Sequence, residues 1–94
     1  MQVKWLRKAA LNLEDAYDYL AKENPRVAQE FVREVYKEVL LLVGQPAIGR
    51  PGRVPGTREL ILRGYPFVIP YRVKADEIQI LRVFHTKRSP PSRW

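Results

Sequence analysis

The residue of this chain best suited to proton transfer is His85, the only histidine among 94 residues. The unperturbed pKa of an imidazole lies near neutrality, so His85 could act as a general base. A single histidine at the end of an apolar segment can equally be a structural hydrogen-bonding group. Both interpretations stay open on the sequence.

Positive charge is the strongest compositional feature. The chain has 17 lysine and arginine residues against 10 aspartate and glutamate residues, a net charge of +7. A field of this strength on a small chain favours an anionic partner such as nucleic acid, the ribosome or an acidic protein. Charge that serves only solubility is the alternative.

Metal and thiol chemistry have little support. The absence of cysteine excludes disulfides, thiolate metal ligands and cysteine nucleophiles. The carboxylates of Glu14, Asp15 and Asp18 follow a helical pattern that places them mostly on the solvent side. We therefore expect neither a metal nor another cofactor.

A segment rich in glycine and proline carries further arginines. Gly44–Gly56 reads GQPAIGRPGRVPG, with four glycines and three prolines in thirteen residues, which predicts a connection without helix or strand. It places Arg50 and Arg53 near Arg58. The glycine spacing matches neither the P-loop nor the dinucleotide-binding pattern, so we do not expect a phosphate cradle.

Two amphipathic helices must position these residues. Apolar side chains recur at three- and four-residue steps over Lys8–Glu23 and again over Pro25–Val43. Asn24 is suited to cap the second helix, with a proline at its first position. Gly44 should end that helix in a left-handed conformation. The pattern predicts a helix hairpin.

Three apolar segments at hairpin spacing follow the loop, Arg58–Leu62, Phe67–Val73 and Ile78–His85. A fourth short strand is expected at Gln2–Trp5, and Pro70 predicts a bulge or a lapse in pairing. With 46% hydrophobic residues the chain can build one core. The sequence therefore predicts a single α+β domain over residues 1–94, in which the helix hairpin packs on one face of an antiparallel sheet in the order β-α-α-β-β-β.

The last strand segment is apolar on both faces. Alternation places Ile78, Ile80 and Phe84 on one side and Leu81 and Val83 on the other. Two helices cover only one face of a sheet. We therefore expect part of the other face to stay exposed and to mark a protein interface, unless the tail or the loop folds over it.

The two ends of the chain carry polar and basic residues. Residues 85–94 form a short basic tail whose two prolines prevent a closing helix, so we expect it to be irregular and mobile, with Trp94 packed against the body. The first residues alternate without a long apolar run, which argues against a signal peptide and a membrane span. We expect a soluble, cytoplasmic protein.

Several of these blocks are typical of one family when they occur together. They are Gly49-Arg50, Arg58-Glu59-Leu60, Tyr71-Arg72-Val73 and Ile80-Leu81-Arg82-Val83-Phe84-His85. Over nearly its whole length the chain resembles the RelE/ParE superfamily of bacterial toxins. The resemblance implies a toxin encoded with a cognate antitoxin, with which it forms a hetero-oligomer.

The two-sided strands and the positive charge suggest how such an antitoxin would bind. We expect an acidic, partly disordered segment to fold onto the protein, burying apolar surface and pairing with cations. The expected contact residues are Arg58, Tyr65, Phe67, Tyr71 and Arg72.

The superfamily has two arms, and the RelE-like arm cleaves messenger RNA on the ribosome with cations on the second and third strands. By position in the family pattern, these cations fall here on Glu59, Ile61 and Val68. None of these can stabilise the negative charge of a phosphate transition state. If the chain is a ribonuclease, the resemblance leaves as its catalytic set Arg58, Arg63, Arg82, His85, Lys87 and Arg88.

The ParE-like arm poisons DNA gyrase and performs no chemistry of its own. The Phe67–Val73 segment with its proline and the basic tail look more like this arm. We therefore favour gyrase as the target and keep the ribosome and its messenger RNA as the alternative. The expected target-binding residues are Arg82, His85, Lys87, Arg88, Arg93 and Trp94.

Overall fold

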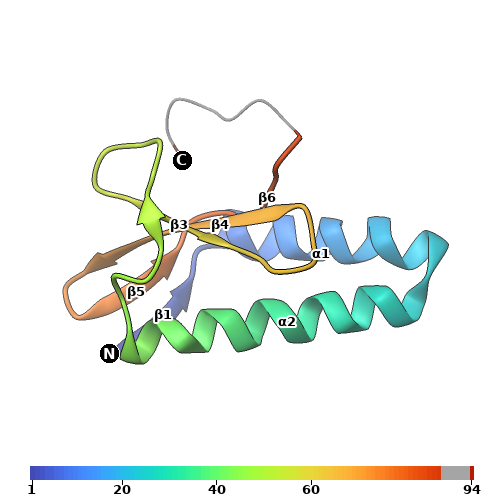
Figure 1. Ribbon diagram of the computed structural model, residues 1–94, viewed down its shortest axis with the longest axis horizontal. Helices are drawn as coiled ribbons and strands as arrows, with labels where there is room; N and C mark the ends of the chain where they lie inside the picture. Colours follow the sequence, from blue (N-terminus) through green and yellow to red (C-terminus); the bar gives the residue numbers. More distant parts are fainter. Residues whose placement is uncertain (88–93) are drawn as a thin grey trace.

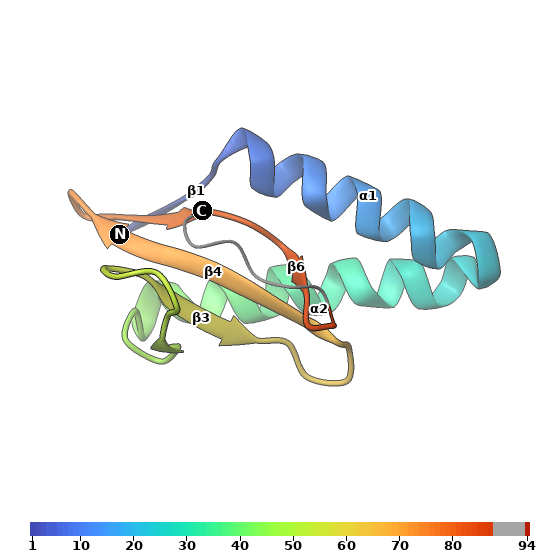
Figure 2. The same cartoon turned by 90° about the horizontal axis from the view of Figure 1, so that it is seen from above.

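A computed structural model describes residues 1–87 and residue 94 of the chain (Figure 1). Its elements, in chain order, are β1 (Gln2–Trp5), α1 (Arg7–Glu23), α2 (Pro25–Gly44), β2 (Arg50–Pro51), β3 (Arg58–Ile61), β4 (Phe67–Lys74), β5 (Glu77–Ile80) and β6 (Phe84–His85). The two helices lie side by side (Figure 2) and pack against a mixed sheet, which confirms the predicted α+β class.

The turn between the helices is fixed by Asn24, as predicted. Its side-chain oxygen accepts hydrogen bonds from the backbone N–H groups of Arg26 at 3.1 Å and Val27 at 3.3 Å. The prediction for the other end of α2 was wrong, because Gly44 remains helical and Gln45, with φ of −139°, is the capping residue. The Gln45 N–H still donates to the carbonyl of Leu41 at 3.0 Å, so no left-handed residue is needed there.

The sheet is mixed, whereas the sequence predicted an antiparallel one. Its strand order is β1-β5-β4-β3-β2, with β6 also paired to β4. The meander of β3, β4 and β5 is antiparallel as predicted, but β1 runs parallel to β5, from Gln2 opposite Glu77 to Trp5 opposite Ile80. Side-chain alternation in β1 indicates which residues face the core and says nothing about strand direction.

The glycine- and proline-rich segment contains a short strand, which corrects the prediction of a loop without strands. Arg50 and Pro51 form β2, antiparallel to β3, with Arg50 opposite Glu59. An edge strand tolerates proline because one side of its backbone needs no partner. This strand brings the loop to the sheet.

The pairing of β4 lapses at Pro70, as predicted. β4 pairs with β5 as far as Tyr71 opposite Ile80, and with β6 from Val68 opposite Phe84. Three residues, 81–83, therefore lie opposite only two residues of β4, 69–70. The extra residue is a bulge between β5 and β6. Proline has no N–H to donate at this point. Its carbonyl still accepts a hydrogen bond from the N–H of Leu81 at 2.9 Å.

This bulge changes which side chains face the helices. Val83 joins Ile78 and Ile80 in the main core, while Leu81 is buried outside that core. The expectation that Val83 and Leu81 share a face was wrong, as was the grouping of Phe84 with Ile78. An inserted residue reverses the alternation of every side chain that follows it.

Most of the second face of the sheet is covered, and among the described residues the expected exposure is confirmed only at Ile61, which lies opposite Val68 and is 47% exposed. Val68 is 1% exposed and Leu81 is 7% exposed. The loop after β2 and the end of the chain lie on this side of the sheet, opposite α2 (Figure 1). Trp94 packs as predicted, with its ring 5.8 Å from that of Phe84.

The main core lies between the helix hairpin and the other face of the sheet. Phe31 of α2 is fully buried, and its ring lies 5.0 Å from Phe67 and 5.3 Å from Tyr65. The most exposed large apolar side chains are on the helices instead, with Tyr19 at 68% and Leu40 at 66%.

We predict that Phe31→Ala lowers the free energy of unfolding by about 3–5 kcal/mol, because it removes a buried ring and leaves a cavity. Urea unfolding at pH 7 measures the change. Leu40→Ala on the same helix is the control and should cost less than about 1 kcal/mol, since that side chain is mostly exposed. Equal midpoints for the two variants would contradict the helix register described here.

Candidate functional site

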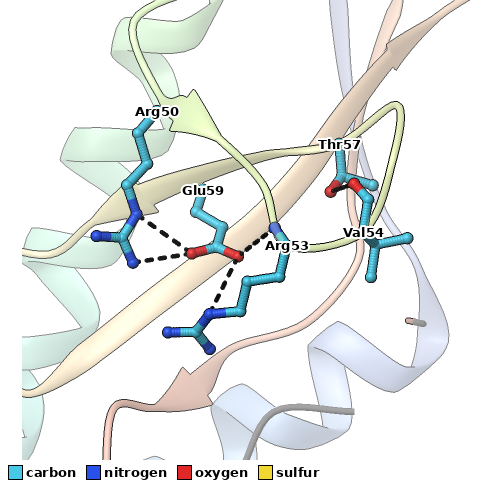
Figure 3. A network of polar contacts seen from close by, with 5 residues as sticks. All are labelled: Arg50, Arg53, Val54, Thr57 and Glu59. Atoms are coloured by element: carbon cyan, nitrogen blue, oxygen red, sulfur yellow. Dashed lines mark hydrogen bonds and ion pairs between the residues drawn. The ribbon is translucent and has the colours of Figure 1, made fainter. Parts of the chain in front are cut away.

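A buried glutamate joins the loop to the second face of the sheet (Figure 3). One oxygen of the fully buried Glu59 side chain accepts hydrogen bonds from Arg50, from Nη2 at 2.9 Å and from Nε at 3.3 Å. The other oxygen accepts from the backbone N–H of Arg53 at 3.1 Å and lies 3.8 Å from its Nε. We call Glu59, Arg50 and Arg53 the Glu59 network.

The charge of Glu59 is sustained by its partners. Burial raises the pKa of this carboxyl, but the backbone N–H of Arg53, the hydrogen bond from Arg50 and the positive charge of both arginines outweigh it. The pKa of Glu59 therefore lies below its ordinary value of 4.5. At neutral pH Glu59 is an ionised carboxylate whose negative charge is balanced inside the protein by Arg50 and Arg53.

Tyr71 fixes the beginning of the same loop. Its hydroxyl donates to the carbonyl of Pro46 at 2.8 Å and accepts from the N–H of Gly49 at 2.9 Å. A Cβ on Gly49 would lie 2.7 Å from the Tyr71 ring, so this approach requires glycine. Burial raises the pKa of Tyr71, which keeps the hydroxyl protonated. Arg58 donates to the carbonyls of Gly49 at 2.8 Å and Ala47 at 3.3 Å.

Two of the sequence blocks that carried the family resemblance thus act as loop anchors. Gly49-Arg50 and Arg58-Glu59 meet across β2 and β3, and every one of these residues holds the loop in place. Sequence reasoning did not identify the pairing of Glu59 with Arg50. A signal was present, because a carboxylate inside an apolar strand requires a cation or hydrogen-bond donors when it is buried.

The residues of the predicted ribonuclease set do not converge on one cleft. Arg58 is bound to loop carbonyls, and Arg63 lines a cleft between α2 and β3. Arg82 instead donates through Nη2 to the main-chain oxygen of Trp94 at 3.2 Å. Arg88 and Arg93, which belong to the predicted catalytic and target-binding sets, lie outside the described residues.

His85 and Lys87 lie together in a different cleft. This space of about 360 Å³ between β6 and α1 is also lined by Asp15 and Tyr19. Nδ1 of His85 accepts from the backbone N–H of Lys87 at 3.1 Å, so Nε2 carries the proton of the neutral ring. The imidazole also packs edge-on against Phe67 at 5.1 Å. His85 therefore has the packing and hydrogen bonding of a structural histidine.

The residues expected to meet an antitoxin differ in accessibility. Tyr71 and Phe67 are 0% and 7% exposed and belong to the core, so a partner could not reach them without opening it. Tyr65 and Arg72 are partly exposed. Arg58 is partly exposed as well, and the antitoxin contact stays a prediction for all five residues.

Residues 1–87 and Trp94 contain neither a metal-binding cluster nor a membrane-spanning helix. No three histidine, aspartate or glutamate side chains there are arranged to hold a metal ion. Neither helix in that part combines the length and the apolar character needed to cross a bilayer.

Comparison with solved structures identifies the fold to which this arrangement of helices and strands belongs. The fold is that of RelE/ParE-type toxins: the intact E. coli RelBE toxin–antitoxin complex contains a chain with a TM-score of 0.64 over 93% of this chain and 98% of that one, at 14% identity. A chain of the chromosomal ParDE toxin–antitoxin system from P. aeruginosa matches with a TM-score of 0.82 and 42% identity over 93% of this chain and 97% of that one.

Sequence similarity identifies the family to which the chain belongs within this class of toxins. The protein named "Putative toxin Y4kP" from Sinorhizobium fredii is 37% identical over 90 residues, which is 96% of this chain and 93% of that protein. The family model "ParE toxin of type II toxin-antitoxin system, parDE" matches residues 3–90. The chain belongs to this family of ParE toxins, which confirms the ParE-like arm of the superfamily.

We predict that Glu59→Gln lowers the free energy of unfolding by about 1–3 kcal/mol at pH 7, because the variant loses charge-assisted hydrogen bonds in a buried position. The pKa of Glu59 is lower in the folded protein than its ordinary 4.5. This stabilisation is therefore fully present above about pH 4.5 and disappears as the pH falls through the folded pKa.

Urea unfolding of both proteins between pH 3 and pH 7 tests this dependence. The exposed Glu14→Gln serves as the control and should track the wild type at every pH. If the free energies of unfolding of the wild type and Glu59→Gln differ by as much at pH 3 as at pH 7, the charge of Glu59 is not what stabilises the fold.

Proposed function

We propose that this ParE-family toxin inhibits DNA gyrase by binding alone and cleaves no RNA. The observation that carries the proposal is Glu59, which occupies a position where the ribonuclease arm of the superfamily has a cation. Its carboxylate is fully buried and its pKa is lowered, so it is negative at neutral pH and neutralised by Arg50 and Arg53. Such a group cannot stabilise a phosphate transition state.

The other positions support the same conclusion. Ile61 and Val68 fall where the ribonuclease arm has further cations, and neither side chain is charged. Two other basic residues of the predicted set are engaged at separate places, with Arg58 on loop carbonyls and Arg82 on the main-chain oxygen of Trp94. Inhibition through surface contact needs no such convergence. Gyrase acts in the bacterial cytoplasm, and we propose that the toxin does too.

The antitoxin is the second proposed partner. The structures similar to this one come from toxin–antitoxin systems, including ParDE of P. aeruginosa and RelBE of E. coli. We propose that a cognate antitoxin neutralises this toxin through an acidic segment that is partly disordered when free and folds on binding. A charge of +7 and exposed apolar side chains on the helices both suit such a segment.

One observation favours the ribosome as the alternative target. His85 and Lys87 share their cleft with Asp15 and Tyr19, so a proton-transfer group and a cation do lie together. Messenger RNA cleavage on the ribosome is therefore the second candidate function.

Two assays distinguish the targets. The purified toxin should inhibit supercoiling by gyrase and accumulate cleaved DNA, and it should leave messenger RNA intact on translating ribosomes. His85→Ala should retain gyrase inhibition within a few-fold, whereas loss of a general acid or base costs an enzyme about 10²–10⁴-fold. Codon-dependent cuts in ribosome-bound message, abolished by His85→Ala and without any effect on gyrase, would replace this proposal with the alternative.

For the antitoxin, we predict tight binding with a markedly negative heat-capacity change, because a folding segment buries apolar surface. Isothermal titration calorimetry at several temperatures, with the product of the adjacent small gene, measures it. A heat-capacity change near zero would contradict folding on binding, and the absence of a complex would contradict the partnership itself.

A further inference from the structure

A second cleft lies on the face of the sheet opposite the helix hairpin, apart from the one that contains His85. It measures about 580 Å³ and lies between the first residues of α1, the tip of the loop after β2, the strand β4 and Trp94. Pockets that bind small ligands commonly have volumes of about 300–1,000 Å³. The cleft is therefore large enough for a nucleotide unit, and of its lining residues only Arg72 and Trp94 belong to the contact sets predicted from the sequence.

The cleft is cationic. Arg7 and Lys8 line it from α1 and Arg72 from β4, and no acidic side chain is among the residues that line it. The Nε of Arg72 donates to Gln79 at 2.6 Å, which orients the guanidinium. Its two Nη nitrogens make no hydrogen bond within the described part of the chain. Arg7, Lys8 and Arg72 therefore bring three positive charges to two walls of the cleft.

This concentration of charge is unfavourable for the empty protein. Arg7 and Lys8 stand at the first two positions of α1, where the partial charge of the helix dipole is also positive. The first turn of α1 contains no acidic residue, and Leu6 at its N-cap provides no side-chain cap. An anion in the cleft would relieve this repulsion, with Arg72 as a third partner.

Trp94 adds an aromatic surface to the same cleft. Its ring is held against Phe84 at 5.8 Å, and its main-chain oxygen accepts a hydrogen bond from Arg82 at 3.2 Å. The side chain still lines the cleft and is partly exposed. A fixed aromatic ring beside a row of cations is the arrangement by which proteins hold single-stranded nucleic acid, with bases stacked on the ring and phosphates on the cations.

We propose that this cleft binds a single strand of nucleic acid, with its phosphates on Arg7, Lys8 and Arg72 and a base against Trp94. An acidic peptide would also pair with the cations, but it has no planar base to place on the indole. The inference concerns free nucleic acid and does not depend on gyrase as the target. Failure of one proposal therefore leaves the other standing.

Fluorescence anisotropy with labelled 12-nucleotide DNA and RNA strands of one sequence, over a range of salt concentrations, tests the inference. The cleft variant is Arg7→Gln with Lys8→Gln and Arg72→Gln. The matched control is Lys22→Gln with Arg26→Gln and Arg33→Gln, which removes three exposed cations of the helix hairpin and gives the same net charge. Urea unfolding of each variant shows that the fold is retained.

We expect the wild type to bind at least one of the two strands, and the DNA and RNA measurements show which sugar is preferred. The slope of log K against log salt should fall by about 2 in the cleft variant, since each phosphate contact on a single strand contributes about 0.7. The control should keep the wild-type slope. Trp94→Leu should weaken binding by about 5- to 150-fold with little change in slope.

Three results would overturn the inference. Equal losses in the cleft and control variants would mean that strands bind only the diffuse positive field. The absence of binding to either strand at 50 mM salt would mean that the cleft is not a nucleic-acid site. If a glutamate-rich peptide binds the cleft more tightly than both strands, the occupant is an acidic protein segment and the proposal is wrong.

Discussion

The buried carboxylate of Glu59 is the constraint on which the loop side of this molecule depends. A charged group inside an apolar strand destabilises the fold unless cations and hydrogen-bond donors meet it. Arg50 and the backbone of Arg53 do so, and both belong to the loop. The loop therefore lies against the second face of the sheet. Together with Trp94, which packs on Phe84, it helps to keep that face from being an open apolar surface.

This arrangement divides the arginines into two groups with different roles. One group binds partners within the protein and consists of Arg50, Arg53 and Arg58. In the sequence these three residues look like a cluster that could bind an anion. Arg7 was not singled out by any sequence block, and Arg72 belongs to the block Tyr71-Arg72-Val73; both lie in the cleft on the second face of the sheet. The blocks Gly49-Arg50 and Arg58-Glu59 therefore stabilise the fold, whereas Arg72 of the block Tyr71-Arg72-Val73 lines the cleft for which we propose nucleic-acid binding.

The elements that the sequence predicted well are those with local signals. The helix hairpin follows from apolar periodicity and from Asn24 before a proline, and the strands of the meander follow from their turn residues. The direction of β1 could not be predicted, because its partner β5 is distant in sequence. The bulge after Ile80 had a signal in Pro70, but its position, and hence the side of Val83, depended on the pairing of β6. The Glu59 network joins residues that are nine positions or fewer apart, yet the glycines and prolines between them hid β2.

An ionised, buried Glu59 holds the loop on the sheet. Nuclear magnetic resonance of the wild type tests this role directly, by following the Glu59 carboxyl carbon and the hydrogen exchange of the Arg53 amide as the pH is lowered. We predict that Glu59 titrates below 4.5 and that protection of the Arg53 amide is lost with the same midpoint. A carboxyl that titrates at its ordinary value, beside an Arg53 amide that exchanges as fast as in an unfolded chain, would contradict the account.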